Sequence, residues 1–230
     1  NDKLRKANVE LDNFVYSVSH DLRSPIASVL GLVNLAKQEE DIKMMRSYIQ
    51  MIGDSATQQD RFIKDILDIS RNERQEVEPE EIQFETMLNE IFEQLKYSSN
   101  GANIIKMIEI EQKSAFRSDI RRLKVIFNNL ISNAIRYSHN DPPQINIDIK
   151  VDDMLAKITI NDQGKGIPLE HQEKVFNMFY RAHDDNAGSG LGLYIVKETV
   201  EKLRGNVELD SIENEGTTVS LEIPNLQPVF

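Results

Sequence analysis

A histidine followed directly by an acidic residue is the first feature of this chain that could do chemistry. His20 and Asp21 lie in the segment of residues 14–25. On a helix, Ser24 shares the face of His20 because it follows four residues later, whereas Asp21 lies about 100° round the axis. A carboxylate there can accept the proton of one imidazole nitrogen while the other nitrogen attacks phosphorus. This predicts an exposed phosphoryl acceptor, although an isolated histidine–aspartate pair is more often only part of a solvated surface.

Pro25 allows two interpretations of the same segment. It either begins a new helix or bends one continuous helix, since proline suits the first helical turn and breaks a hydrogen bond further in. Apolar spacing continues through Leu22 and Ile26, which favours the bend. The carbonyl of Asp21 would then lose its helical partner, and the backbone beside His20 would be loosened.

Three later segments have the residue types of a nucleotide site, and the first spans residues 128–137. Asn129 and Asn133 share one face of a predicted helix because they are four residues apart. Their amide oxygens suit Mg²⁺, which prefers hard oxygen ligands and shares phosphates as ligands. Arg136 is placed to meet a phosphate. The alternative for this segment alone is an ordinary polar helix face.

The second segment, residues 162–168, directly follows a predicted strand. Gly164 and Gly166 allow the backbone to approach a flat ring closely. The carboxylate of Asp162 can accept from an exocyclic amine, which favours adenine over guanine. An ordinary glycine turn is the alternative.

The third segment is rich in small residues and opens a predicted helix. Backbone N–H groups at a helix N-terminus favour anionic phosphate. The pattern is neither a Walker A sequence nor a GxGxxG fingerprint. The candidate phosphate-binding residues are Gly188, Gly190, Leu191 and Gly192.

Residues 176–187 lie between the last two segments and begin with aromatic side chains. An aromatic base that packs and a polar remainder that moves are typical of a lid over a nucleotide. Arg181 in this lid could reach a terminal phosphate. We expect His139, His171 and His183 to be solvated, since none has metal-ligand spacing.

The elements that position the first site follow from heptad spacing over residues 1–75. Two amphipathic helices, separated by a break at residues 38–41, predict an antiparallel hairpin, with Gln59 as a polar interruption of its apolar seam. One hairpin has too little core to stand alone, so we expect a homodimer that forms a four-helix bundle. The seam begins with Leu4, Ala7, Leu11, Phe14 and Val18.

Residues 71–80 are polar, contain proline and lack apolar periodicity, which predicts a linker. Beyond it, strands and helices that do not alternate regularly predict an α+β sandwich with helices on one face. The expected helices are residues 85–97, 119–137 and 192–203. The expected strands are residues 82–84, an antiparallel pair at 144–151 and 155–160, and a hairpin at 206–210 and 217–223.

Composition excludes several classes of function. A net charge of −11 over 230 residues provides no basic field for a nucleic acid. The absence of cysteine excludes disulfides and cysteine nucleophiles and fits a reducing compartment. No apolar run approaches the roughly 20 residues of a membrane span, so we expect a cytoplasmic segment without membrane contact. Because the chain begins with Asn1 and not Met, we expect a piece of a longer protein with a membrane anchor or a sensor upstream.

These segments, in this order, resemble the sensor histidine kinases of two-component signalling over nearly the whole chain. SHDLRSP resembles the family's H box, NLISNAIRYS its N box, NDQGKGIP its G1 box, VFNMFYR its F box and GSGLGL its G2 box. The resemblance implies a dimeric helical phosphotransfer domain at residues 1–75. A Bergerat-type ATP-binding domain at residues 76–230 would follow it.

The resemblance also implies a role for individual residues. It makes His20 the phosphoacceptor, Asp21 its base, Asn133 the Mg²⁺ ligand, Asn129 an assistant, Arg136 a phosphate contact, Tyr137 a nucleoside neighbour and Asp162 the adenine reader. Many relatives have Thr or Asn four residues after the histidine, where it orients water for dephosphorylating the response regulator. Ser24 stands there in this chain and is smaller, so kinase activity is expected and phosphatase activity is an open question.

The leading hypothesis is an ATP:protein-histidine phosphotransferase that passes the phosphoryl group to an aspartate of a response regulator receiver domain. An upstream sensor module would act on it through the N-terminal helix. A Bergerat ATPase that works as a conformational gate is the second hypothesis, but it gives the His20 segment no role. A non-enzymatic dimeric scaffold is the third, and the intact nucleotide motifs count against it.

Overall fold

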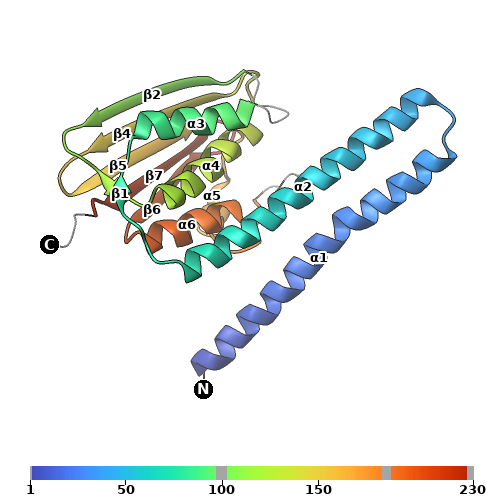
Figure 1. Ribbon diagram of the computed structural model, residues 1–230, viewed down its shortest axis with the longest axis horizontal. Coiled ribbons are helices and arrows are strands. Elements are labelled where there is room, and N and C mark those ends of the chain that lie inside the picture. Colours follow the sequence, from blue (N-terminus) through green and yellow to red (C-terminus); the bar gives the residue numbers. More distant parts are fainter. Residues whose placement is uncertain (1, 97–102, 183–187, 227–230) are drawn as a thin grey trace. The chain divides into compact units, whose positions relative to one another are not determined.

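The computed structural model describes residues 2–96, 103–182 and 188–226, with side chains from Phe14 onward (Figure 1). The chain divides into two compact units, residues 1–67 and residues 68–230. Residues 68–74 of the second long helix therefore belong with the second unit. The predicted domain boundary after residue 75 stays a prediction.

The first unit is a helical hairpin of α1 (Asp2–Gln38) and the greater part of α2 (Ile42–Arg74). Pro25 lies inside α1, so the prediction of one continuous helix is confirmed. Asp41 begins α2 by accepting the N–H of Lys43 at 2.7 Å, which satisfies a donor that has no helical partner.

The hairpin buries little apolar surface by itself. Phe62, which is 5% exposed, is the buried hydrophobic residue of this unit among the described side chains. Many large apolar side chains of both helices are exposed to solvent, as expected for one half of a helical bundle. The exposed ones are Val15, Tyr16, Ile26, Leu30, Leu35, Ile42, Met44, Ile49, Met51, Ile63 and Leu67.

The second unit is an α+β sandwich, as predicted. Its main sheet has the strand order β2-β4-β5-β7-β6, in which β2 and β4 are parallel and the other pairs are antiparallel. These strands are β2 (Ile105–Gln112), β4 (Gln144–Val151), β5 (Leu155–Asp162), β6 (Asn206–Ile212) and β7 (Gly216–Pro224). The short strands β1 (Glu80–Glu81) and β3 (Arg117–Ser118) form a separate pair.

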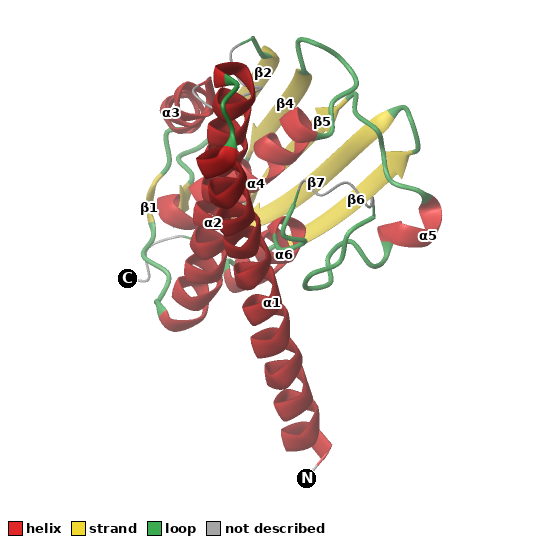
Figure 2. Ribbon diagram, turned by 90° about the vertical axis from the view of Figure 1, so that its right-hand side faces the viewer, coloured by secondary structure: helices red, strands yellow, loops and turns green. Residues whose placement is uncertain are grey.

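Three helices cover one face of this sheet (Figures 1 and 2). They are α3 (Phe84–Lys96), α4 (Ile120–Arg136) and α6 (Gly192–Lys202), while the one-turn α5 (Leu169–Gln172) lies beside β6. Alternate residues of β4 are buried, because only the face toward the helices is covered. The apolar sides of α3, α4 and α6 and the inner face of the sheet form one continuous core.

Three expectations about this unit were wrong or incomplete. The strand predicted at residues 82–84 is not there, since β1 ends at Glu81 and Phe84 already begins α3. The strand β2 was not anticipated. The linker predicted at residues 71–80 is helical up to Arg74.

Candidate functional site

His20 lies on the surface of α1 and contacts the adjacent acid. Its Nδ1 is 3.1 Å from Oδ1 of Asp21, and the two side chains are 70% and 25% exposed. Nδ1 is therefore the nitrogen that the carboxylate polarises, and Nε2 is the nitrogen that a phosphoryl group can reach. Ser24 is exposed one turn further along the same helix.

The backbone beside the proline of α1 receives a hydrogen bond from α2. Nε2 of Gln59 donates to the carbonyl of Leu22 at 3.3 Å. The polar residue that interrupts the apolar seam thus supplies a donor close to the point where Pro25 cannot.

The paired amides of α4 face the beginning of α6. Nδ2 of Asn129 donates to the carbonyl of Val125 at 2.9 Å, and this fixes the orientation of the amide. A methyl group added to Gly192 would lie 3.1 Å from Oδ1 of Asn129 and 3.8 Å from Oδ1 of Asn133. The structure therefore brings the two amides of α4 together with the N-terminus of α6, and their role as Mg²⁺ ligands stays a prediction.

Arg136 and Tyr137 reach the glycine loop from the end of α4. A methyl group on Gly188 would lie 3.1 Å from Nη1 of Arg136 and 3.4 Å from the hydroxyl of Tyr137. A guanidinium beside backbone N–H groups at a helix start is suited to an anionic phosphate.

Asp162 ends β5 with its carboxylate largely withdrawn from water. The N–H of Gly164 donates to its Oδ1 at 2.8 Å. Burial raises the pKa of this carboxyl above its ordinary value, and hydrogen bonds from the N–H groups of Gly164 and Thr217 counter part of that rise. The arrangement leaves a partly buried acceptor at the C-terminal end of β5, the central strand of the sheet, where an adenine amine could donate to it.

The turn after Asp162 is joined to the turn between β6 and β7. The N–H of Asn214 donates to the carbonyl of Lys165 at 2.7 Å. Gly166 has a φ of +62°, and a methyl group there would lie 2.0 Å from the carbonyl oxygen of Ile212. Only glycine fits a backbone approach of this kind.

The glycine loop packs closely against the aromatic first part of the predicted lid. Gly190 has a φ of +70°, and a methyl group there would lie 2.6 Å from the carbonyl carbon of Phe179. Phe179 itself has a φ of +63°. Leu191 is fully buried and directly precedes α6, so its side chain packs and only its backbone faces the site.

The base of the lid is held by a histidine that we expected to be solvated. Nδ1 of His171 is 2.6 Å from the hydroxyl of Tyr180, and the imidazole is only partly exposed. His139 is exposed, as expected, and so is Arg181. Residues 183–187, which include His183, lie outside the described residues, so the lid stays a prediction.

The donor set of α4 fits a magnesium ion that is also held by phosphates. Among the described residues, no group of three histidine, aspartate or glutamate side chains is placed to bind a metal. Mg²⁺ keeps several waters and takes phosphate oxygens, so few protein ligands are needed. The side-chain oxygens of Asn133 and Asn129, which lie beside Gly192, could supply them.

One group of buried charged side chains had no role in the sequence prediction. Arg122 and Asp119 lie at the start of α4 and are 6% and 1% exposed. The partners of Arg122 include Asn72, which precedes it by 50 residues, so spacing gave no signal for this contact.

Comparison with known proteins places both units in one family. Residues 10–75 match the family model described as "His Kinase A (phospho-acceptor) domain". Residues 118–227 match "Histidine kinase-, DNA gyrase B-, and HSP90-like ATPase". The chain belongs to the sensor histidine kinases.

Curated histidine kinases are similar in sequence to most of this chain. The methanogenesis regulatory histidine kinase FilI of Methanothrix harundinacea is 32% identical over 94% of the chain, which covers 25% of that protein. The sensor protein kinase WalK of Staphylococcus aureus is 29% identical over 94% of the chain, which covers 54% of that sequence. The chain thus spans about half the length or less of these relatives.

Solved structures share the fold of this kinase. ThkA in complex with the response regulator protein TrrA has a TM-score of 0.75 at 23% identity, covering 96% of this chain and 64% of that one. AdeS of Acinetobacter baumannii has a TM-score of 0.69 at 21% identity, covering 90% and 98%. Within the described residues, no helix has the length and apolar character to cross a membrane.

Proposed function

We propose that this histidine kinase uses ATP and Mg²⁺ to phosphorylate its own His20 and then passes the phosphoryl group to an aspartate of a response regulator receiver domain. The observation that carries the proposal is the exposed imidazole whose Nδ1 is 3.1 Å from Asp21, in a chain that also holds the amide, carboxylate and glycine groups of a nucleotide site.

The chemical step follows from the geometry around His20. Nε2 forms a bond to the γ-phosphorus, the bond from that phosphorus to the bridging oxygen breaks, and ADP leaves. The proton on Nδ1 passes to the carboxylate of Asp21, which removes the positive charge that develops on the ring and also holds the ring orientation. Catalysis of this kind depends chiefly on positioning and on charge stabilisation.

The nucleotide site contributes binding and orientation. Asp162 accepts from the adenine amine, Tyr137 lies beside the nucleoside, and Arg136 with the glycine loop meets the phosphates. Asn133, assisted by Asn129, holds Mg²⁺, which neutralises phosphate charge when bound. Arg181 approaches the terminal phosphate from the lid.

We also propose that two copies of the hairpin form a four-helix bundle. The exposed apolar side chains of α1 and α2 support this, because one hairpin leaves them in water. Residues 1–75 would serve phosphotransfer and dimerisation, and residues 76–230 ATP binding. We place these domains in the cytoplasm, where ATP and receiver domains are available, with an upstream sensor acting through α1.

Labelling with γ-labelled ATP and Mg²⁺ tests the proposal. We expect an acid-labile protein phosphate that is absent in His20→Gln and retained in the control His139→Gln, which changes another exposed histidine. Phosphate release without labelled protein would instead support the ATPase gate. Neither signal would support the scaffold. Adding a purified receiver domain should then move the label to it.

A further inference from the structure

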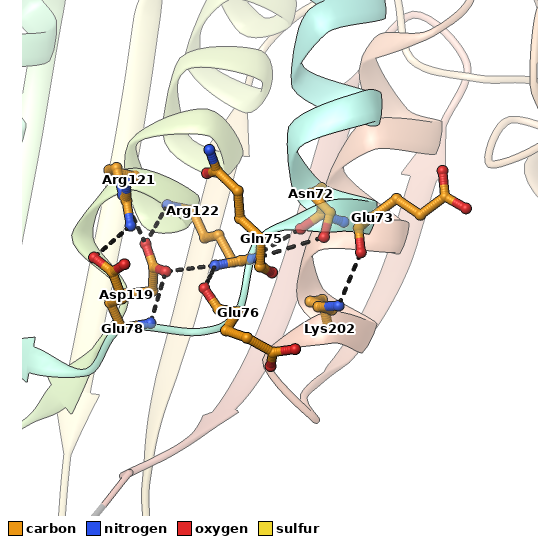
Figure 3. Close-up of polar contacts among 9 residues, drawn as sticks. All are labelled: Asn72, Glu73, Gln75, Glu76, Glu78, Asp119, Arg121, Arg122 and Lys202. Atoms are coloured by element: carbon orange, nitrogen blue, oxygen red, sulfur yellow. Dashed lines mark hydrogen bonds and ion pairs between the residues drawn. The ribbon is translucent and has the colours of Figure 1, made fainter.

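A buried arginine of α4 donates several hydrogen bonds to the C-terminal end of α2 (Figure 3). The guanidinium of Arg122 donates to the carbonyls of Gln75 at 2.6 Å, Glu76 at 3.2 Å and Asn72 at 3.4 Å. Its Nε donates to Oδ1 of Asn72 at 3.0 Å. All of these residues belong to the second unit.

A second cation reaches the same end of α2 from α6. Nζ of Lys202, the last residue of α6, donates to the carbonyl of Glu73 at 3.3 Å (Figure 3). The last carbonyls of a helix lack helical partners and carry partial negative charge, so cations there are stabilising. Two helices thus supply the cap that α2 cannot make for itself.

Asp119 fixes Arg122 in place and extends the contact into the chain after α2. Its carboxylate accepts the N–H of Arg122 at 3.1 Å, which caps α4, and the N–H of Glu78 at 3.2 Å. It also pairs with the Arg122 guanidinium. The four residues Arg122, Lys202, Asp119 and Asn72 are called the α2 clamp below.

The two helices that hold α2 also carry the nucleotide site at their other ends. Arg122 stands in the first turn of α4, and Asn133 stands about 16 Å further along the same helix. α6 begins at Gly192, beside the α4 amides, and ends at Lys202. Both helices therefore join the end of α2 to the groups expected to hold ATP.

We infer that the α2 clamp is a positioning device for autophosphorylation, which makes the last turn of α2 move together with the nucleotide-binding helices. A sensor that changes the conformation of α2 would then also shift the helices of the ATP site. Because coupling between two sites is reciprocal, a bound nucleotide would in turn stabilise the end of α2. The inference rests on the proposed function of His20. Arg122 acts through the position of α4 and touches no reacting atom.

The test compares Arg122→Lys with Arg121→Lys in the full chain. The first change keeps a positive charge beside Asp119 but loses the planar fork that reaches several carbonyls. The second makes the same change at the neighbouring residue, which is 55% exposed, pairs with Glu78 at 2.7 Å and meets Asp119 only at 4.0 Å. For each protein we would measure ATP affinity, the rate of His20 labelling at saturating ATP, and hydrogen exchange of the Gln75 and Glu78 amides.

We expect Arg122→Lys to lower the labelling rate at saturating ATP by about 5-fold or more, the lower end of typical coupling, and to change ATP affinity by less than about 2-fold. An ATP analogue that cannot transfer its γ-phosphoryl group should slow exchange of the Gln75 and Glu78 amides in the unmodified protein and in Arg121→Lys. It should have no such effect in Arg122→Lys.

Unchanged labelling in Arg122→Lys, or a nucleotide effect on exchange that survives it, would overturn the inference. An equal loss of ATP affinity and rate would assign Arg122 to the nucleotide site itself and would also overturn it. If Arg122→Lys fails to fold, Asn72→Ala with Lys202→Met decides in the same way, since both lie outside the core of α4. If the unmodified protein labels no histidine, the proposed function fails, and the exchange measurements still decide whether the clamp couples the two ends.

Discussion

Replacing Asp162 by asparagine should have two separate effects: it should weaken ATP binding, and it should remove the free-energy cost of burying a charged carboxylate. The variant keeps the shape of the side chain and an oxygen that can accept the N–H of Gly164, which is now 2.8 Å away. It replaces the other carboxylate oxygen by a donor, which cannot accept from an adenine amine. A hydrogen bond to a charged group contributes about 1.5–3 kcal/mol, so the dissociation constant for ATP should rise about 10- to 150-fold.

The same substitution should change how stability depends on pH. Burial raises the folded-state pKa of Asp162 above its unfolded value of 3.8, so the folded protein binds this proton more tightly than the unfolded chain does. The carboxyl therefore favours folding less and less as the pH rises from the unfolded value through the raised folded pKa. The free energy of unfolding of the unmodified protein should decline in that window relative to Asp162→Asn.

Two measurements decide the matter, with Asp210→Asn, an exposed change on the same sheet, as the control. Calorimetric titration with ATP gives the affinity, and urea unfolding over a pH series that rises from the unfolded value of 3.8 gives the stability as the raised pKa is passed. An ATP affinity within about threefold of the unmodified protein would refute the adenine-reading role. Parallel stability curves for Asp162→Asn and the unmodified protein would refute the burial argument.

Three further substitutions have distinct expected outcomes. Arg122→Ala leaves its carboxylate partner buried without a counter-charge, so it should lower the free energy of unfolding by about 3–5 kcal/mol. The control Arg121→Ala should lower it by less than about 1 kcal/mol. Equal losses for the two variants in urea unfolding would contradict this. Gly166→Ala should lower both Tm and ATP affinity, because its methyl group meets backbone 2.0 Å away, whereas Gly53→Ala, which meets nothing within 4 Å, should raise stability by about 1 kcal/mol. Ser24→Thr should speed dephosphorylation of a receiver domain while His20 labelling changes less than about 2-fold, and an unchanged dephosphorylation rate would remove any role for this position.

The helical hairpin and most of the sheet could be predicted because their signals are local. Apolar spacing kept its phase across Pro25, and α1 is continuous there. Alternation at Ile145, Ile147 and Ile149 gave β4, whose inner face those residues form. The segments predicted to bind nucleotide lie at the ends of elements with a readable period, so their positions in the fold could be predicted, while their binding roles stay predictions.

The predictions that were wrong concern elements whose contacts are distant in the sequence or whose side chains are exposed to solvent. β2 is mostly exposed at the sheet edge, where it pairs in parallel with β4, and its apolar alternation toward the core is limited to Ile108 and Ile110. Ile82 and Phe84 alternate like a strand, but both are buried beside the start of α3. The polar composition of residues 71–80 predicted a linker, whereas Arg122 satisfies carbonyls there from far along the chain.

The turn between β6 and β7 has a practical consequence for anyone who modifies this protein. A short, polar surface hairpin is where an epitope tag or a fluorophore is normally inserted. Here Asn214 is bonded to the backbone of Lys165, and Ile212 leaves no room for a side chain at Gly166. If Asp162 and Gly166 bind adenine as proposed, a label in this turn would alter that binding, and a reporter of nucleotide occupancy could be built there for the same reason.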